Sequence, residues 1–355
     1  MTRLALTIAI AGAALSVAPL LAHKPVTSKY TFSEDVYPIV KAQCGGCHVA
    51  GGIAPMSLMT YEDARPWAES IRLELTSGHM PPWYGDPGAA PLRDVHKLSP
   101  RDLDVVLTWV TGGTPPGPPM KTTPATARRS WPRGRPDVVL QMPAAVTLAA
   151  DKSEDTQEFV LRDDNDRDRT IAFADLLPGN PSIVHDAIVF SRQRGAAEPA
   201  AVFTAWLPGG APAGPSPGFA FVWRAHEQLV ARIHYKKNWK LENKPASDRS
   251  SVGLYLTTST AREIRGVPVG GADELASRLQ AVAVRVASGS ADAPVRVDAI
   301  RPDGTRLTIA AFVARAGWDQ RYWLARPVDL PKGTRIEVSR TAATNVRVWL
   351  DASTM

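Results

Sequence analysis

The chain has 355 residues, of which 44% are hydrophobic and 21% are charged, so it can bury ordinary cores and is long enough for two or three domains. Its formal net charge of +6 is modest and its lysines and arginines are scattered, so nucleic acid is not an expected partner. The chain contains only two cysteines, which excludes a framework of several structural disulfides.

The first 22 residues have the pattern of a secretory signal peptide. Arg3 precedes an apolar stretch from Leu4 to Val17, and the segment ending at Ala22 predicts a cleavage site. The alternative is an uncleaved membrane anchor, which needs about 20 apolar residues. This stretch is shorter and is followed by Pro19. We therefore expect a periplasmic or otherwise exported protein with no stable membrane span after cleavage.

Both cysteines lie in the sequence Cys44-Gly45-Gly46-Cys47-His48, a C-x-x-C-H motif. In such a motif the two thiols add to the vinyl groups of a haem, and the imidazole of the next residue binds the iron. C-x-x-C alone could be a redox pair or half of a zinc site, but zinc needs a second ligand pair and no further cysteine exists. The motif predicts one covalent haem c on Cys44 and Cys47, with His48 as an iron ligand and electron transfer as the function of this segment.

Apolar residues at helical spacing surround this motif. The patterns predict one helix that leads into Cys44, a second between Thr60 and Gly78, and a third between Ser99 and Gly113. Three helices around a C-x-x-C-H motif predict a small all-α class I cytochrome c domain over residues 23–113.

Domains of that class usually supply a methionine as the second axial ligand, since a thioether favours the reduced iron. Met80 lies in the proline-rich loop Gly78-His79-Met80-Pro81-Pro82 and is the predicted ligand. The alternatives are that His79 binds the iron or that the position is open, with Met80 only packing. Met56 and Met59 are interpreted as packing residues of the pocket wall.

The composition changes after the third predicted helix. Residues 114–136 are rich in proline and predict a linker. Beyond it, short stretches of alternating apolar and polar residues are separated by glycine and proline turns, which predicts antiparallel β-sandwiches. The length suggests two of them, at 137–240 and 241–355. The expected fold class is therefore multidomain: a small all-α class I cytochrome c domain followed by all-β tandem antiparallel β-sandwiches.

Several stretches of the chain resemble one known family. They are Tyr30 to Ile39, Gly51 to Leu58, Met80 to Tyr84, Val184 to Phe190, Ala205 to Gly209, Arg232 to Tyr235, Asp248 to Leu254 and Leu330 to Glu337. Over most of the chain after the signal peptide, the sequence is similar to bacterial cytochrome c domains fused to copper type II, ascorbate-dependent monooxygenase-like domains. The resemblance implies two β-sandwiches like those of peptidylglycine α-hydroxylating monooxygenase, with one copper per sandwich.

The resemblance implies a copper site on the first sandwich at His185, Asp186 and His234, where the family has three histidines. One ligand of the three is therefore changed. The first sandwich either binds no metal and serves as a scaffold or binding surface, or keeps a single metal site formed by His185, His234 and either Asp186 or His226. Two imidazoles and a carboxylate can bind copper, zinc or iron.

The second copper of the family is held by a His-x-His pair and a methionine. This chain has no histidine after His234, and after Met142 its only methionine is Met355. The second copper site is therefore expected to be absent, and both metals are needed for hydroxylation in the family.

Two functions of different classes remain open. The first is an exported c-type cytochrome that exchanges single electrons with a periplasmic donor or acceptor protein and whose β half lacks monooxygenase activity. The second is a haem-coupled, copper-dependent monooxygenase-like oxidoreductase with one mononuclear copper at His185 and His234. The sequence favours the non-enzymatic function and assigns no catalytic residue.

Overall fold

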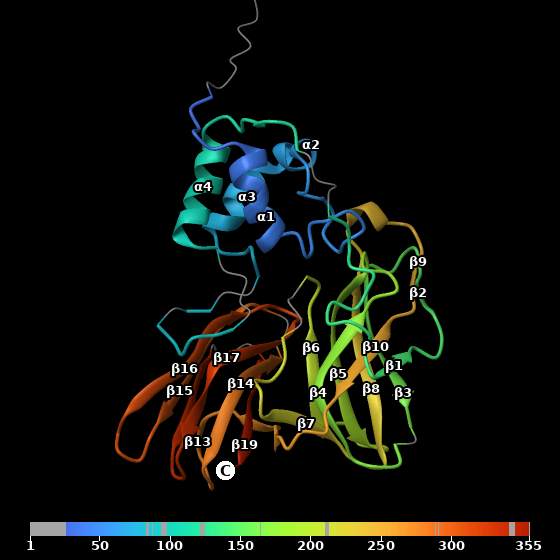
Figure 1. Cartoon of the computed structure of the whole chain (residues 1–355), viewed down its shortest axis with the longest axis vertical. Coiled ribbons are helices and arrows are strands. Elements are labelled where there is room, and N and C mark those ends of the chain that lie inside the picture. The colour runs from blue at the N-terminus through green and yellow to red at the C-terminus, as the bar shows by residue number, and fades with distance from the viewer. Residues whose placement is uncertain are drawn as a thin grey trace, which may run out of the picture.

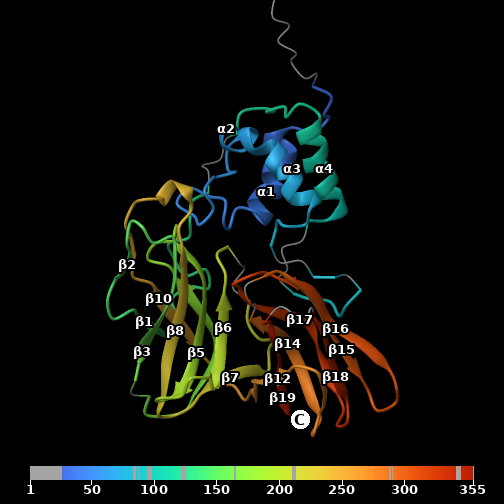
Figure 2. The ribbon, with the colours of Figure 1, turned by 180° about the vertical axis from the view of Figure 1, so that it is seen from behind.

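The computed structural model describes residues 26–82, 85–86, 88–93, 98–120, 125–163, 165–209, 213–287, 289, 291–340 and 345–354. The predicted signal peptide at 1–22 lies outside the described residues. Figure 1 shows a helical N-terminal region next to two neighbouring groups of strands, and Figure 2 shows the same arrangement from behind. No helix in the described ranges is long and apolar enough to cross a membrane.

The helices of the N-terminal region are short. They are Tyr37–Gln43 (α1), Tyr61–Ala64 (α2), Ala68–Thr76 (α3) and Pro100–Thr111 (α4), with single turns at Phe32–Val36 (η1) and Arg65–Trp67 (η2). Local caps explain two of the starts, since the side chains of Thr60 and Ser99 accept the backbone N–H groups of Asp63 and Asp102. Gly78 ends the α3 segment with a φ of 70°, a conformation that favours glycine.

The helices share a small buried cluster. Phe32, Met59 and Trp109 are completely buried in it, and the rings of Phe32 and Trp109 lie 5.7 Å apart. The Trp109 indole N–H donates to the carbonyl of Pro115 at 3.0 Å, which ties α4 to the start of the predicted linker.

The predicted fold class, with its small all-α class I cytochrome c domain at 23–113, is wrong. Strands make up 43% of the chain, and no distinct all-α domain is present in the part that the structure describes. The helices are 4 to 12 residues long and are separated by irregular segments. Glycines and prolines such as Gly51, Gly52, Pro81 and Pro82 interrupt the helical pattern there, because they disfavour continuation of a helix.

Two sheets form the first β-sandwich. One contains Val138–Gln141 (β1), Ser251–Leu256 (β10), Arg169–Leu177 (β4), Phe219–Trp223 (β7) and Arg262–Glu263 (β11), and the other Glu154–Arg162 (β3), Glu227–Lys236 (β8), Val184–Gln193 (β5) and Ala201–Trp206 (β6). Val146–Leu148 (β2) and Ala246–Asp248 (β9) pair at one end. The core between the sheets includes Phe221, Trp223 and Tyr235. Strands β9, β10 and β11 follow Lys240 and still belong to this sandwich.

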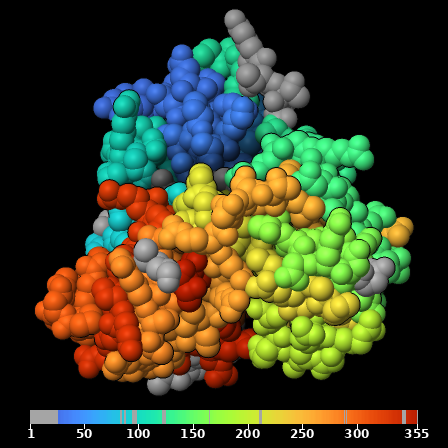
Figure 3. Space-filling model, turned by 60° about the horizontal axis from the view of Figure 1, so that its bottom comes forward, coloured from blue at the N-terminus to red at the C-terminus, as the bar shows by residue number. Residues whose placement is uncertain are grey.

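Two four-stranded sheets form the second β-sandwich. One contains Arg265–Val269 (β12), Arg347–Thr354 (β19), Leu279–Ala287 (β14) and Asp319–Leu330 (β17), and the other Ala272–Glu274 (β13), Arg335–Arg340 (β18), Ala293–Ile300 (β15) and Arg306–Ala314 (β16). The core between them contains alternating residues of β15 from Ala293 to Ala299, Ile336 of β18 and buried residues of β14. In Figure 3 the two sandwiches appear as neighbouring lobes.

The helical region contacts both sandwiches. Leu92 forms a β-bridge with Leu324 of β17, and Gly85 forms one with Phe312 of β16. The Asn238 side chain, beside the turn Trp239–Leu241 (η3), donates to the carbonyl of Ile53 at 3.1 Å. A cavity lies where the helical region meets the two sandwiches.

Candidate functional site

The C-x-x-C-H motif forms a tight turn at the end of α1. The N–H groups of Cys47 and His48 both donate to the carbonyl of Cys44, at 3.1 and 2.9 Å. The two residues between the cysteines have no room for a side chain. A Cβ on Gly45 would lie 2.5 Å from the Lys41 carbonyl oxygen, and one on Gly46 would lie 2.2 Å from Cα of Gly209.

The two thiols lie in a buried setting. The Cys47 thiol donates to the carbonyl of Pro208 at 3.3 Å, on the segment that follows β6. Burial raises the pKa of Cys44 to about 11, and burial together with the neighbouring Cys44 raises the pKa of Cys47 to about 12. A thiol that stays protonated is a poor nucleophile and a poor thiolate ligand, so this setting disfavours a thioredoxin-like redox pair.

The His48 ring is held by one of its two nitrogens. Its Nδ1 lies 3.3 Å from the carbonyl of Met56, and the His48 carbonyl accepts the N–H of Leu58. A proton on Nδ1 directed at this carbonyl leaves the lone pair of Nε2 available for a metal, the usual arrangement of a ligating histidine. Burial lowers the pKa of His48, although the Met56 contact acts in the opposite direction, so the neutral ring that a metal requires is favoured.

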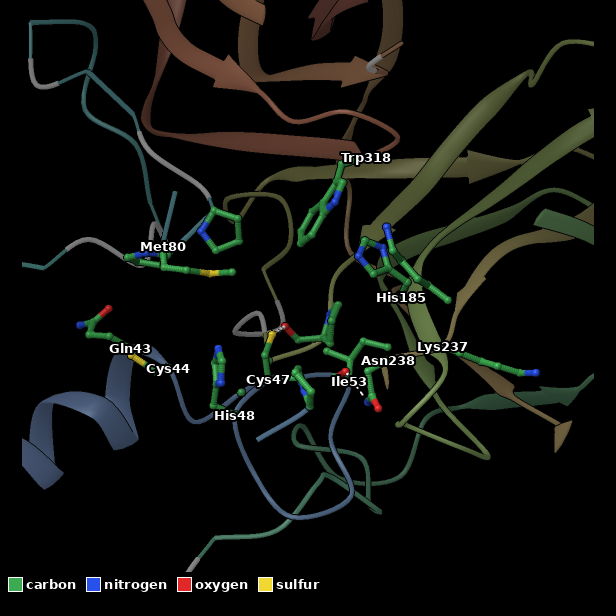
Figure 4. A pocket seen from close by; sticks show the side chains of 18 residues that line it. Gln43, Cys44, Cys47, His48, Ile53, Met80, His185, Lys237, Asn238 and Trp318 are labelled. Atoms are coloured by element: carbon green, nitrogen blue, oxygen red, sulfur yellow. Dashed lines mark hydrogen bonds between the residues drawn. The ribbon is translucent and has the colours of Figure 1, made fainter. Parts of the chain in front are cut away.

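A cavity of about 280 Å³ adjoins the motif, is partly open to solvent and is lined mainly by apolar atoms. Its lining includes Cys44, Cys47, His48 and Met80 from the helical region, and His185, Lys237, Asn238 and Trp318 from the β half. Figure 4 shows the Met80 side chain and the His48 ring projecting into this space from different segments. The donors present fit a haem: two thiols for attachment, one imidazole and one thioether.

Met80 and His79 differ in their relation to the cavity. Met80 lines it and is 43% exposed, whereas His79 is not part of the lining and its side chain is 61% exposed. The His79 Nδ1 instead lies 3.6 Å from a carboxylate oxygen of Glu74. The geometry therefore favours Met80 over His79 as the partner of His48. Met59 is fully buried in the helical core, where it can only pack.

A second group of ionisable residues lies at the start of β5. His185, Asp186 and His234 each offer a ligand atom, and these atoms lie within 4.8 Å of one another. One oxygen of Asp186 lies 2.8 Å from Nδ1 of His185 and 2.7 Å from Nδ1 of His234. The pairing of β5 with β8 shifts register between Val184 and Asp186, so His185 and Asp186 both come close to His234.

A further carboxylate completes the surroundings of His234. Its Nε2 lies 2.7 Å from Oε1 of Glu154 on β3. Burial alone would lower the pKa of His234, but the hydrogen bonds and charges of Asp186 and Glu154 outweigh burial and raise it. Burial and the nearby Asp186 also raise the pKa of Asp319, on β17, to about 6. Neither Glu154 nor Asp319 has a local sequence signal that could have identified it.

His185 belongs to both sites. Its ring centroid lies 4.8 Å from that of His234 and 4.8 Å from that of Trp318, and both His185 and Trp318 line the cavity beside His48. His226 is separate from this cluster and occupies a turn with a φ of 65°, where its N–H donates to the carbonyl of Asn165. Two imidazoles and one carboxylate form a donor set that suits copper, zinc or iron.

Comparisons with known proteins name no family. No family model matches the chain, and no curated protein matches it. Among solved structures, the chain is similar to an F-lectin from the serum of Morone saxatilis, the striped bass, at 10% identity over 59% of this chain and 86% of the lectin, with a TM-score of 0.15. A likeness at this TM-score carries no argument about fold or function.

Proposed function

We propose that this chain is an exported c-type cytochrome that carries one covalent haem and exchanges single electrons with a periplasmic donor or acceptor protein. The observation that carries the proposal is the C-x-x-C-H turn at the edge of a cavity into which His48 and Met80 both project. A haem bound there supplies a one-electron carrier whose potential depends on its axial ligands and its exposure.

The residues of the chain have separate tasks in this proposal. Cys44 and Cys47 hold the group covalently, and the Met56 carbonyl orients the His48 imidazole through Nδ1. In a haem held there, the Met80 thioether would favour the reduced state of the iron. The apolar lining limits access of water and so stabilises the less charged, reduced state.

The histidine cluster favours a second candidate function. Since His185, Asp186 and His234 converge within 4.8 Å and His185 also lines the cavity, one metal ion held there could exchange electrons with the haem. Hydroxylation by the copper family requires a further metal on the second sandwich. That part of the chain has no histidine, so we expect no ascorbate-dependent hydroxylation even with added copper.

Haem staining after denaturation tests the first proposal. The full-length protein, produced in cells that perform c-type maturation, should retain haem on a denaturing gel, and the Cys47→Ala variant should lose most of the stain. The control is His226→Ala, because His226 lies outside both sites and should stain like the wild type. Haem that dissociates from the denatured wild-type protein would refute covalent attachment.

Metal analysis separates the two candidates. One iron per chain and no other metal supports an electron-transfer cytochrome alone. One further stoichiometric transition metal, lost in the His185→Ala, His234→Ala double variant, supports a haem-coupled metal centre.

A further inference from the structure

The turn that joins β16 to β17 reaches the helical region. Arg315 in this turn donates from Nη2 to the carbonyl of Gly78 at 2.6 Å, across 237 positions in the sequence. Its Nη1 lies 2.6 Å from Oδ2 of Asp292, whose other oxygen accepts the N–H of Ala316 at 2.8 Å. Only 12% of the Arg315 side chain is exposed, so the guanidinium is held between the two partners.

The backbone that receives this hydrogen bond leads directly to Met80. The N–H groups of His79 and Met80 donate to the carbonyl of Glu74 in the last turns of α3, at 3.1 and 3.3 Å. The segment 78–80 is therefore held on one side by α3 and on the other by Arg315. A cation is also favoured at this position because the C-terminal end of a helix carries a partial negative charge.

The same turn contributes to the cavity. The N–H of Trp318 donates to the carbonyl of Arg315 at 3.2 Å, and the Trp318 side chain lines the cavity next to His185. In Figure 4 the side chains of Trp318 and Met80 are both drawn above that of His48. One short turn of the second sandwich thus fixes the Met80 segment and forms part of the cavity wall.

We infer that Arg315 is a positioning residue for Met80, and that the second sandwich, which has no histidine, is a structural part of the haem site. This inference rests on the proposed function. Met80 is 43% exposed, so packing alone does not hold its side chain toward His48. The hydrogen bond from Arg315 to Gly78 reduces the freedom of the loop and so favours the conformation in which the thioether faces the cavity.

Arginine suits this position better than lysine. The planar guanidinium can satisfy the Asp292 carboxylate and the Gly78 carbonyl at once through two separate N–H groups, whereas an ammonium is a compact point charge on a flexible stem. We therefore expect a lysine at position 315 to hold the Met80 segment less firmly than arginine does, but more firmly than alanine.

The test uses the full-length haem protein and reads the axial ligand directly. The oxidised wild type should show the weak near-infrared band of a thioether bound to ferric iron, and Arg315→Ala should lose most of it. Imidazole competes with Met80 for the iron, so the apparent affinity of Arg315→Ala for imidazole should rise about tenfold, as expected for one lost hydrogen bond from a charged donor. Asp292→Asn should change both readouts in the same direction by a smaller amount.

A matched control removes another arginine of the second sandwich. Arg278→Ala breaks an exposed pair with Asp329, in which Nη2 and Oδ2 lie 2.6 Å apart. Among the described residues this pair makes no hydrogen bond to the segment 78–80, so the variant should leave the band and the imidazole affinity unchanged. If Arg315→Ala does not fold, the band and the imidazole affinity are measured in Arg315→Lys and Asp292→Asn instead. An unchanged band in these variants would overturn the inference, while a wild type with covalent haem but no such band would remove its basis. A wild type without covalent haem would instead refute the proposed function.

Discussion

At the scale of single residues, the proposal that Met80 binds the iron gives the most specific prediction. It lines the cavity with His48, whereas His79 lies outside it beside Glu74. Met80→Ala should therefore remove the near-infrared band of the oxidised haem protein. It should also lower the reduction potential, because the thioether that favours the reduced iron is lost.

The neighbouring histidine supplies the control for this prediction. His79→Ala removes an exposed ring that lies beside Glu74 and does not line the cavity, so it should leave the band in place. A band that persists in Met80→Ala would assign it to another methionine, and a wild-type haem protein without the band would exclude Met80 as the ligand.

Gly46 and Gly209 allow two backbones to touch. A Cβ on Gly46 would approach Cα of Gly209 to 2.2 Å, so either the C-x-x-C-H turn or the segment after β6 would have to move. Gly46→Ala should lower the free energy of unfolding by about 1–3 kcal/mol, the usual cost of overpacking. Chemical denaturation measures this loss. Gly271→Ala is the control, since a Cβ there meets nothing within 4 Å, and an equal loss in both variants would argue against the contact.

Asp319 predicts a dependence of stability on pH. Because burial and Asp186 raise its pKa from 3.8 to about 6, the folded chain binds a proton at Asp319 more tightly than the unfolded chain does. The associated stability is present below about pH 4 and is lost as the pH rises through about 6. Asp319→Asn should therefore raise the free energy of unfolding at pH 7 by up to about 3 kcal/mol and have little effect near pH 4.

Denaturation curves at the two pH values test this difference. Asp151→Asn, which removes an exposed carboxylate, is the control. A stabilisation by Asp319→Asn that is equally large near pH 4 would show that a cause other than titration is responsible.

At the scale of elements, strand β5 brings the histidine cluster together. Its register shift next to Val184 places His185 and Asp186 near His234 on β8. We expect the β half to bind at most one transition-metal ion, with Asp186→Ala weakening binding because one of three ligands is lost. Metal titration of the purified protein measures the stoichiometry. A second tight site that survives the His185→Ala, His234→Ala double variant would contradict this expectation.

Local chemistry could be predicted from the sequence, and distant contacts could not. The starts of α2 and α4 follow from Thr60 and Ser99, whose side chains accept N–H groups three residues later. The predicted helix from Thr60 to Gly78 is instead divided into α2, η2 and α3. Pro66 lies at the division and limits continuous helical hydrogen bonding.

The surroundings of the site depend on strand pairing over long distances in the sequence. Glu154 reaches His234 because β3 pairs with β8, which brings together residues 80 positions apart. Arg315 reaches Gly78 only because the turn after β16 faces the end of α3. Neither the spacing of apolar residues nor a sequence motif near Glu154 or Arg315 predicts these contacts. The C-x-x-C-H motif was recognisable because its donors are adjacent in sequence.

At the scale of the whole molecule, the helical region is not self-contained. Its loops bond to Pro208, Asn238 and Arg315 of the β half, and Leu92 pairs with Leu324. A chain that ends at Met120 loses all these contacts. Its helical circular dichroism signal should therefore melt at a lower temperature than that of the helices in the full chain, and its loops should be cleaved faster by protease. Equal melting and cleavage would show an independent domain.

The hydrogen bond between the Cys47 thiol and the Pro208 carbonyl also has a consequence for the order of events during synthesis. Pro208 follows Cys47 by 161 positions, so a chain made from its N-terminus exposes both thiols long before the segment after β6 exists. Once that segment has docked, the Cys47 thiol donates to the Pro208 carbonyl and its pKa is about 12, which disfavours the reactive thiolate. Under the proposed function, attachment of a haem therefore belongs to the interval before the β-sandwiches close over the motif. In a chain that folded first, attachment would be slow.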